Sequence, residues 1–127
     1  MSAPEVEEFA RLLIVHVRDL AVSGSDMSLD TDANGPTAKR WRQKMQTGEP
    51  KDLASEMIPD CVDNTLFYLL NAIDQGLLKI SFTASSGKTI DLTEVGESEM
   101  SGWYMATDGW RHEYSKERFA DDLKETE

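Results

Sequence analysis

Apolar side chains recur at helical spacing through the first 75 or so residues, and this pattern predicts helices over about 6–22, 36–46 and 51–75. Pro36 suits the first turn of the second helix, where a missing N–H has no helical partner to lose. The third helix, although interrupted by Pro59, has the broadest apolar stripe. We therefore expect it to lie at the centre of the core.

After Gly76, which is expected to end the third helix in a left-handed conformation, the apolar period changes from helical to two. This change predicts an antiparallel hairpin over about 78–93. A three-residue loop ending at Gly87 places that glycine in the bulge position such hairpins prefer, and it pairs Phe82 with Ile90. The apolar side chains of both strands then share one face.

A second antiparallel hairpin is predicted over about 102–114, around the turn dipeptide Asp108-Gly109. Ser115 is placed to cap a short C-terminal helix after it. The expected fold class is α+β, with the N-terminal helices packed on two hairpins.

The length of 127 residues fits a single domain, 1–127, and the charged ends at 1–5 and 124–127 are expected to be disordered.

One face of the second hairpin would carry Trp103, Trp110, His112 and Tyr114. Such side chains dominate both protein cores and binding hot spots. Two interpretations follow. The face packs against the helices, as a small sheet requires, or it lines a pocket for a small molecule or a protein partner.

The chain carries 24 acidic and 13 basic residues, a net charge of −11. A field of this sign repels nucleic acids and anionic membranes and attracts a protein partner with a basic surface. Candidate partner-binding residues are Asp26 in an acidic loop and Asp60 and Asp63 in the segment 52–78, which has no Lys or Arg.

The segment from Gly35 to Lys51 is the exception, because it holds five basic residues against Glu49 alone. It is expected to pair with acidic side chains of the same chain, with a second subunit in a homodimer, or with an anion.

Cys61 is the only cysteine, so no intrachain disulfide can form, and its apolar surroundings indicate a buried structural thiol. No apolar run has membrane-spanning length, and the first residues lack the features of a signal peptide. The expected location is cytoplasmic.

Residues 30–35 match the first half of a helix–loop–helix calcium loop, with Asp30, Asp32 and Asn34 as weak candidate ligands. The twelfth position, which should supply a bidentate glutamate, is Trp41. An acidic turn or a weak surface calcium site are the two interpretations.

Residues 85–89 end like a phosphate-binding loop but lack its first glycine and its following helix. The two histidines and the single cysteine show no zinc spacing. The sequence therefore predicts no catalytic residues and no cofactor.

Several short segments together resemble a family of small uncharacterised bacterial proteins. They are Phe9-Ala-Arg-Leu-Leu, Arg18-Asp19, Ile58-Pro-Asp, Leu69-Leu-Asn-Ala-Ile-Asp-Gln-Gly, Gly102-Trp-Tyr and Gly109-Trp with Tyr114-Ser-Lys-Glu-Arg-Phe. The last of these is also loosely similar to immunity proteins of bacterial toxin systems. That likeness implies no functional residue.

Charge and resemblance together favour a non-enzymatic protein-interaction domain, such as an immunity-like or antitoxin-like inhibitor of a basic partner. The alternative is an accessory domain that binds a small ligand or, weakly, calcium.

Overall fold

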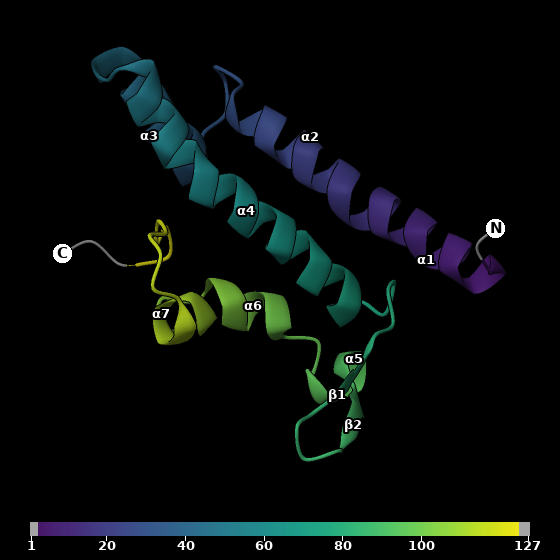
Figure 1. Ribbon diagram of the computed structural model, residues 1–127. Coiled ribbons are helices and arrows are strands. Elements are labelled where there is room, and N and C mark those ends of the chain that lie inside the picture. Colours follow the sequence, from purple (N-terminus) through teal and green to yellow (C-terminus); the bar gives the residue numbers. More distant parts are fainter. Residues whose placement is uncertain (1–2, 125–127) are drawn as a thin grey trace.

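The computed structural model describes residues 3–124 and is mostly helical (Figure 1). Its first helical rod consists of α1 (Pro4–Leu13), a turn of π-helix η1 (Ile14–Arg18) and α2 (Asp19–Ser28). After a loop, α3 (Pro36–Thr47) leads into the long helix α4 (Pro50–Asp74), which runs antiparallel beside the rod. The three predicted helices are confirmed, and the first is longer than expected at both ends.

Helix α4 is the centre of the molecule, because α2, α3, η1, α5 and α6 all contact it. The largest cluster of buried apolar side chains gathers around its C-terminal half and consists of Val17, Ala72, Ile73, Leu78 and Met100. Ala21, Ala38 and Trp41 are also buried. Gly76 has a φ of 72°, which confirms the left-handed ending of this helix. No described helix is both long enough and apolar enough to cross a membrane.

Pro59 lies inside α4 without ending it. A proline has no N–H, so the carbonyl of Ser55, four residues earlier, loses its helical partner. The Arg118 side chain replaces that partner, because its Nε and Nη2 donate to the Ser55 carbonyl at 3.4 and 3.0 Å. A contact from 63 residues away thus compensates the hydrogen bond that Pro59 removes from the helix.

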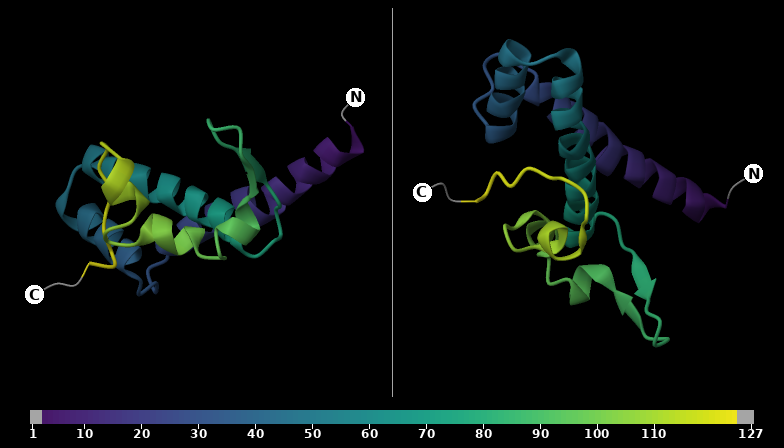
Figure 2. Two further views of the ribbon diagram at one scale, coloured as in Figure 1. Left: turned by 90° about the horizontal axis from the view of Figure 1, so that it is seen from below. Right: turned by 60° about the vertical axis from the view of Figure 1, so that its left-hand side comes forward.

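The first predicted hairpin is confirmed as β1 (Ser81–Thr83) paired antiparallel with β2 (Thr89–Asp91). Phe82 pairs with Ile90, as the loop length predicts, and Gly87 has a φ of 92°. This two-stranded sheet extends away from α4 (Figure 2), while the short helix α5 (Leu92–Val95) stays in contact with it, since the Thr93 hydroxyl donates to the Ile73 carbonyl at 2.8 Å.

The second predicted hairpin, over 102–114, is wrong. The segment forms two short helices instead, α6 (Met100–Met105) and α7 (Trp110–Tyr114). The physical reason is a distant cap. The buried Asp74 carboxylate accepts from the backbone N–H groups of Met100 and Ser101 at 3.0 and 2.9 Å and from the Ser101 hydroxyl at 2.8 Å. These bonds satisfy the N-terminal N–H groups of α6, which local periodicity cannot reveal.

A short helix near the C-terminus is present, but it is α7, ahead of Ser115 rather than after it. Residues 115–121 have no helix, and turns follow up to residue 124. The prediction of disordered ends falls largely on residues 1–2 and 125–127, which lie outside the described residues.

Gly109 joins α6 to α7 by close approach rather than as a hairpin turn. A Cβ at this position would overlap the carbonyl oxygen of Trp103, which belongs to the backbone and has no room to move. We expect Gly109→Ala to lower the free energy of unfolding by roughly 1–3 kcal/mol, as other overpacked sites do. Gly102→Ala is the matched control, because a Cβ added at Gly102 would have no atom of a neighbouring element within 4 Å. Urea denaturation should show the control at or above wild-type stability, and equal losses in both variants would contradict this packing.

Candidate functional site

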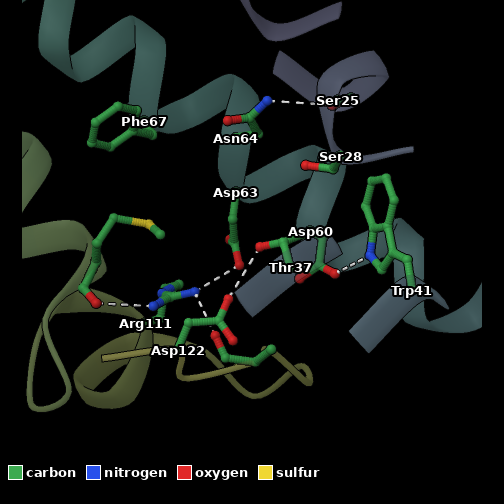
Figure 3. Close-up of a pocket in the computed structure, with 12 residues that line it drawn as sticks. Ser25, Ser28, Thr37, Trp41, Asp60, Asp63, Asn64, Phe67, Arg111 and Asp122 are labelled. Carbon is green, nitrogen blue, oxygen red and sulfur yellow. Dashed lines mark hydrogen bonds and ion pairs between the residues drawn. The ribbon is translucent and has the colours of Figure 1, made fainter. Parts of the chain in front are cut away.

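A cavity of about 240 Å³ lies between α2, α3, α4 and the segment after α6 (Figure 3). We call it the acidic cavity. It is lined by Ser25, Ser28, Thr37, Trp41, Asp60, Asp63, Asn64, Phe67, Met105, Arg111, Ala120 and Asp122. Helix α4 supplies one wall, since Asp60, Asp63, Asn64 and Phe67 recur at spacings of three and four and therefore share a helix face. The structure thus places the predicted Asp60 and Asp63 together at one site.

Arg40 of α3 organises one end of the acidic cavity. Its guanidinium binds Asp60 through two hydrogen bonds of 2.9 and 3.0 Å, Glu56 at 2.7 Å and Asp122 at 2.9 and 3.0 Å. The indole Nε1 of Trp41 also donates to Asp60, at 2.6 Å. This confirms for Arg40 the expectation that the basic segment pairs with acidic side chains of the same chain.

Two opposing effects act on the pKa of the Arg40 guanidinium. Burial alone would lower the pKa of the guanidinium. The hydrogen bonds that it donates to Asp122, Asp60 and Glu56, and the charge of Asp60, outweigh burial and raise the pKa above its usual value. Arg40 therefore stays charged and serves as a fixed cation within the cluster.

Arg111 of α7 organises the other end and is buried, with 5% of its surface exposed. Its Nη1 binds Asp63 at 2.8 Å, and its remaining N–H groups donate to the backbone carbonyls of Tyr104, Met105 and Ala120 at 3.0 to 3.3 Å. The ring of Phe119 lies 4.5 Å from the guanidinium carbon, within cation–π range.

Tyr104 completes this end by donating its hydroxyl proton to Asp63 at 2.6 Å. Burial raises the pKa of the Tyr104 phenol, the hydrogen bond to Asp63 and the charge of that carboxylate raise it further, and Arg111 opposes them. The phenol therefore stays protonated at neutral pH. It acts as a hydrogen-bond donor and not as a base.

The acidic cavity has more acceptors than donors. Four carboxylates, from Glu56, Asp60, Asp63 and Asp122, meet two guanidiniums, so the cluster carries a net charge of −2. Each carboxylate has about four lone-pair sites, so acceptors remain after these bonds are made. Within residues 3–124 every buried side-chain nitrogen and oxygen has a partner. The site can therefore accept an added hydrogen-bond donor or cation.

The other predicted partner residues lie elsewhere. Trp103 and Trp110 are partly buried against the core, with ring centroids 6.4 Å apart, while His112 and Tyr114 are exposed on α7. Asp26 lies on the exposed surface of α2 and does not line the acidic cavity.

The candidate calcium ligands lie in an exposed turn, where Asp30 accepts a hydrogen bond from the Asp32 N–H at 3.0 Å. Trp41, at the position of the bidentate glutamate, is only 1% exposed and points into the acidic cavity. Among residues 3–124, no three His, Cys, Asp or Glu side chains are grouped to hold a metal ion.

Five charged or hydrogen-bonding residues of the cluster were not predicted from the sequence: Arg40, Glu56, Tyr104, Arg111 and Asp122. The concentration of basic residues around Arg40 predicted an ion pair in this segment, but it did not indicate which basic residue would form it. Arg111 and Tyr104 reach the site only because α6 and α7 are helices, and neither belongs to the face of Trp103, Trp110, His112 and Tyr114 that the predicted hairpin singled out.

No protein-family model, curated protein or solved structure matches this chain, so its function is inferred from the residues and geometry described above.

Proposed function

We propose that this chain is a non-enzymatic protein-binding domain whose partner carries a basic surface, in the manner of an immunity protein or an antitoxin. The surplus of carboxylates in the acidic cavity supports this proposal most directly, because it offers acceptors to a Lys or Arg side chain of the partner. The net charge of −11 would speed the approach of such a partner.

The chemistry of the acidic cavity favours binding over catalysis. Neither histidine lines it, and the only cysteine, Cys61, faces a different groove. The Tyr104 phenol is held protonated, and the carboxylates are bound by arginines. A general acid or base needs a pKa near the working pH, and the Tyr104 phenol, whose pKa is raised, does not meet this requirement.

The alternatives have less support. A pocket of about 470 Å³ beside Trp110 and Tyr114 has room for a small molecule, but its exposed lining is mainly apolar. Two of its charged residues, Asp63 and Arg111, already pair with each other. The calcium loop has a buried tryptophan where its strongest ligand belongs.

The test compares two variants that add the same charge. Ser28 lines the acidic cavity, and Ser23 is exposed on the same helix, so Ser28→Lys places a competing cation in the cavity and Ser23→Lys does not. Affinity capture from cells that make the protein should recover a basic protein with wild type and with Ser23→Lys. We expect Ser28→Lys to weaken the purified complex at least tenfold, a loss of about 1.4 kcal/mol.

The same complex should weaken between about 50 and 500 mM NaCl, because its charges are screened. Circular dichroism would establish that Ser28→Lys still folds, and Asp122→Asn provides a second variant that removes charge instead of adding it. A captured partner that binds Ser28→Lys as tightly as wild type, or the recovery of no basic protein, would refute the proposal.

A further inference from the structure

One side of the central helix α4 is left uncovered. Ile58, Val62 and Leu66 are 58%, 54% and 37% exposed, and their spacing of four residues places them in one stripe. The acidic cavity lies along a different face of this helix, since none of the three lines it. An uncharged stripe of large apolar side chains on the central helix is unusual for a monomer.

The first helical rod borders this stripe. A groove of about 560 Å³ runs between the two, with Ile14, Arg18, Val22 and Asp26 on the rod and Cys61 and Thr65 on α4. Cys61 and Thr65 immediately precede Val62 and Leu66, so the groove adjoins the stripe. Ile14, Val22, Ile58, Val62 and Leu66 together form what we call the open helix face.

The total surface of the chain is larger than a monomer of this mass should have. Its accessible area is 9113 Å², whereas a folded monomer of 14.3 kDa exposes about 6,800 Å². The projecting α1, the hairpin and the C-terminal segment account for part of the excess (Figure 2). The rest of the excess of about 2,300 Å² is available for an interface, and an obligate dimer buries roughly 1,000–2,500 Å² on each partner.

We propose that a second copy of this chain covers the open helix face, so that the two rods and the two α4 helices pack as a four-helix bundle. In an interface with two-fold symmetry, the same surface patch of each chain packs against itself in the other chain. On α4, a two-fold axis at Val62 packs that side chain against itself and places Ile58 over Leu66 of the second copy. These contacts are all apolar.

The rod has the same symmetry about Val22. Arg18 and Asp26 stand four residues to either side, each about 6 Å along the helix, so two antiparallel rods that cross at Val22 bring Arg18 opposite Asp26 of the second copy. Among residues 3–124, Arg18 forms an ion pair only with the adjacent Asp19, and its side chain is 66% exposed. Because of the two-fold symmetry, the ion pair between Arg18 and Asp26 would form twice in the dimer.

Both helices place the axis at the same level. Asn64 of α4 donates to the Ala21 carbonyl at 3.1 Å and to the Ser25 hydroxyl at 3.3 Å. The rod around Val22 therefore lies beside the part of α4 around Val62. A single two-fold axis can therefore pass beside both Val62 and Val22. A dimer with this register requires the two residues to lie at the same level.

The experiment measures mass in solution by light scattering coupled to size-exclusion chromatography. Wild type is expected at twice 14.3 kDa and Val62→Glu at 14.3 kDa. Phe82→Glu is the matched control, because Phe82 is equally exposed but lies on the hairpin, and this variant should remain dimeric. A monomeric wild type, or a dimer that survives Val62→Glu, would overturn the proposal.

A charge exchange tests the register. Arg18→Asp and Asp26→Arg each place like charges opposite one another, and each should raise the dimer dissociation constant at least tenfold. The double variant restores opposite charges and should recover most of the wild-type affinity. Single variants without effect, or a double variant weaker than both, would overturn this register even if the chain is dimeric. Ile58 and Val62 border a pocket that Asp63 and Arg111 also line, so the mass and the dissociation constant are measured on the purified chain alone, without a basic partner. A failure of the dimer is thereby distinguished from a failure to bind a basic protein.

Discussion

Replacing Asp63 by Ala should lower the free energy of unfolding by about 3–5 kcal/mol, because it leaves the Arg111 guanidinium buried without its counter-charge. Asp63 and Arg111 are 8% and 5% exposed, so the guanidinium is largely shielded from bulk water. Tyr104 loses its acceptor in the same variant. Urea denaturation followed by circular dichroism measures the change.

Two further variants separate charge burial from loss of a carboxylate in general. Glu117→Ala removes an exposed partner of Arg118 and should cost less than about 1 kcal/mol. The double variant Asp63→Leu/Arg111→Met replaces the ion pair by apolar side chains and should be more stable than Asp63→Ala alone. If Asp63→Ala stays within 1 kcal/mol of wild type, Arg111 is not held as described here.

Trp41→Ala should lower the free energy of unfolding by a similar amount, about 3–5 kcal/mol, for a different reason. Trp41 is 1% exposed, and its removal leaves a void between α3 and α4. Trp41→Phe keeps most of the volume but removes the N–H donor to Asp60, so it should cost only about 1–2 kcal/mol. Thermal unfolding with Phe82→Ala as the exposed aromatic control would check the order. Equal losses for Ala and Phe would show that the hydrogen bond, rather than packing, dominates.

Much of the fold could be predicted because its signals are local. Helical periodicity located α4, and the loop ending at Gly87 set the hairpin register with Phe82 opposite Ile90. The same local reasoning failed at 102–114, where alternation and Asp108-Gly109 suggested strands. Helix α6 begins where it does because Asp74 caps it from 26 residues away, and Gly109 is needed for its contact with Trp103.

The candidate site was predictable only in part. The acidic charge of α4 pointed to Asp60 and Asp63, and their spacing of three implied a shared face. The arginines that bind them lie 20 residues before Asp60 and 48 after Asp63. The ion-pair partner of an arginine cannot be predicted from a single sequence, because the fold decides which carboxylates come within reach of the guanidinium.

The contact between Arg118 and Ser55 has a consequence for how the protein matures. The residues that compensate α4 at Pro59 and complete the acidic cavity, Arg118, Ala120 and Asp122, follow every helix within residues 3–124. Because a chain emerges from the ribosome N-terminus first, an α4 that forms before this segment emerges has the Ser55 carbonyl without Arg118 and Arg40 without one of its carboxylates. A nascent chain that ends at α7 would therefore present the open helix face, on which we propose dimerisation, before its acidic cavity is complete.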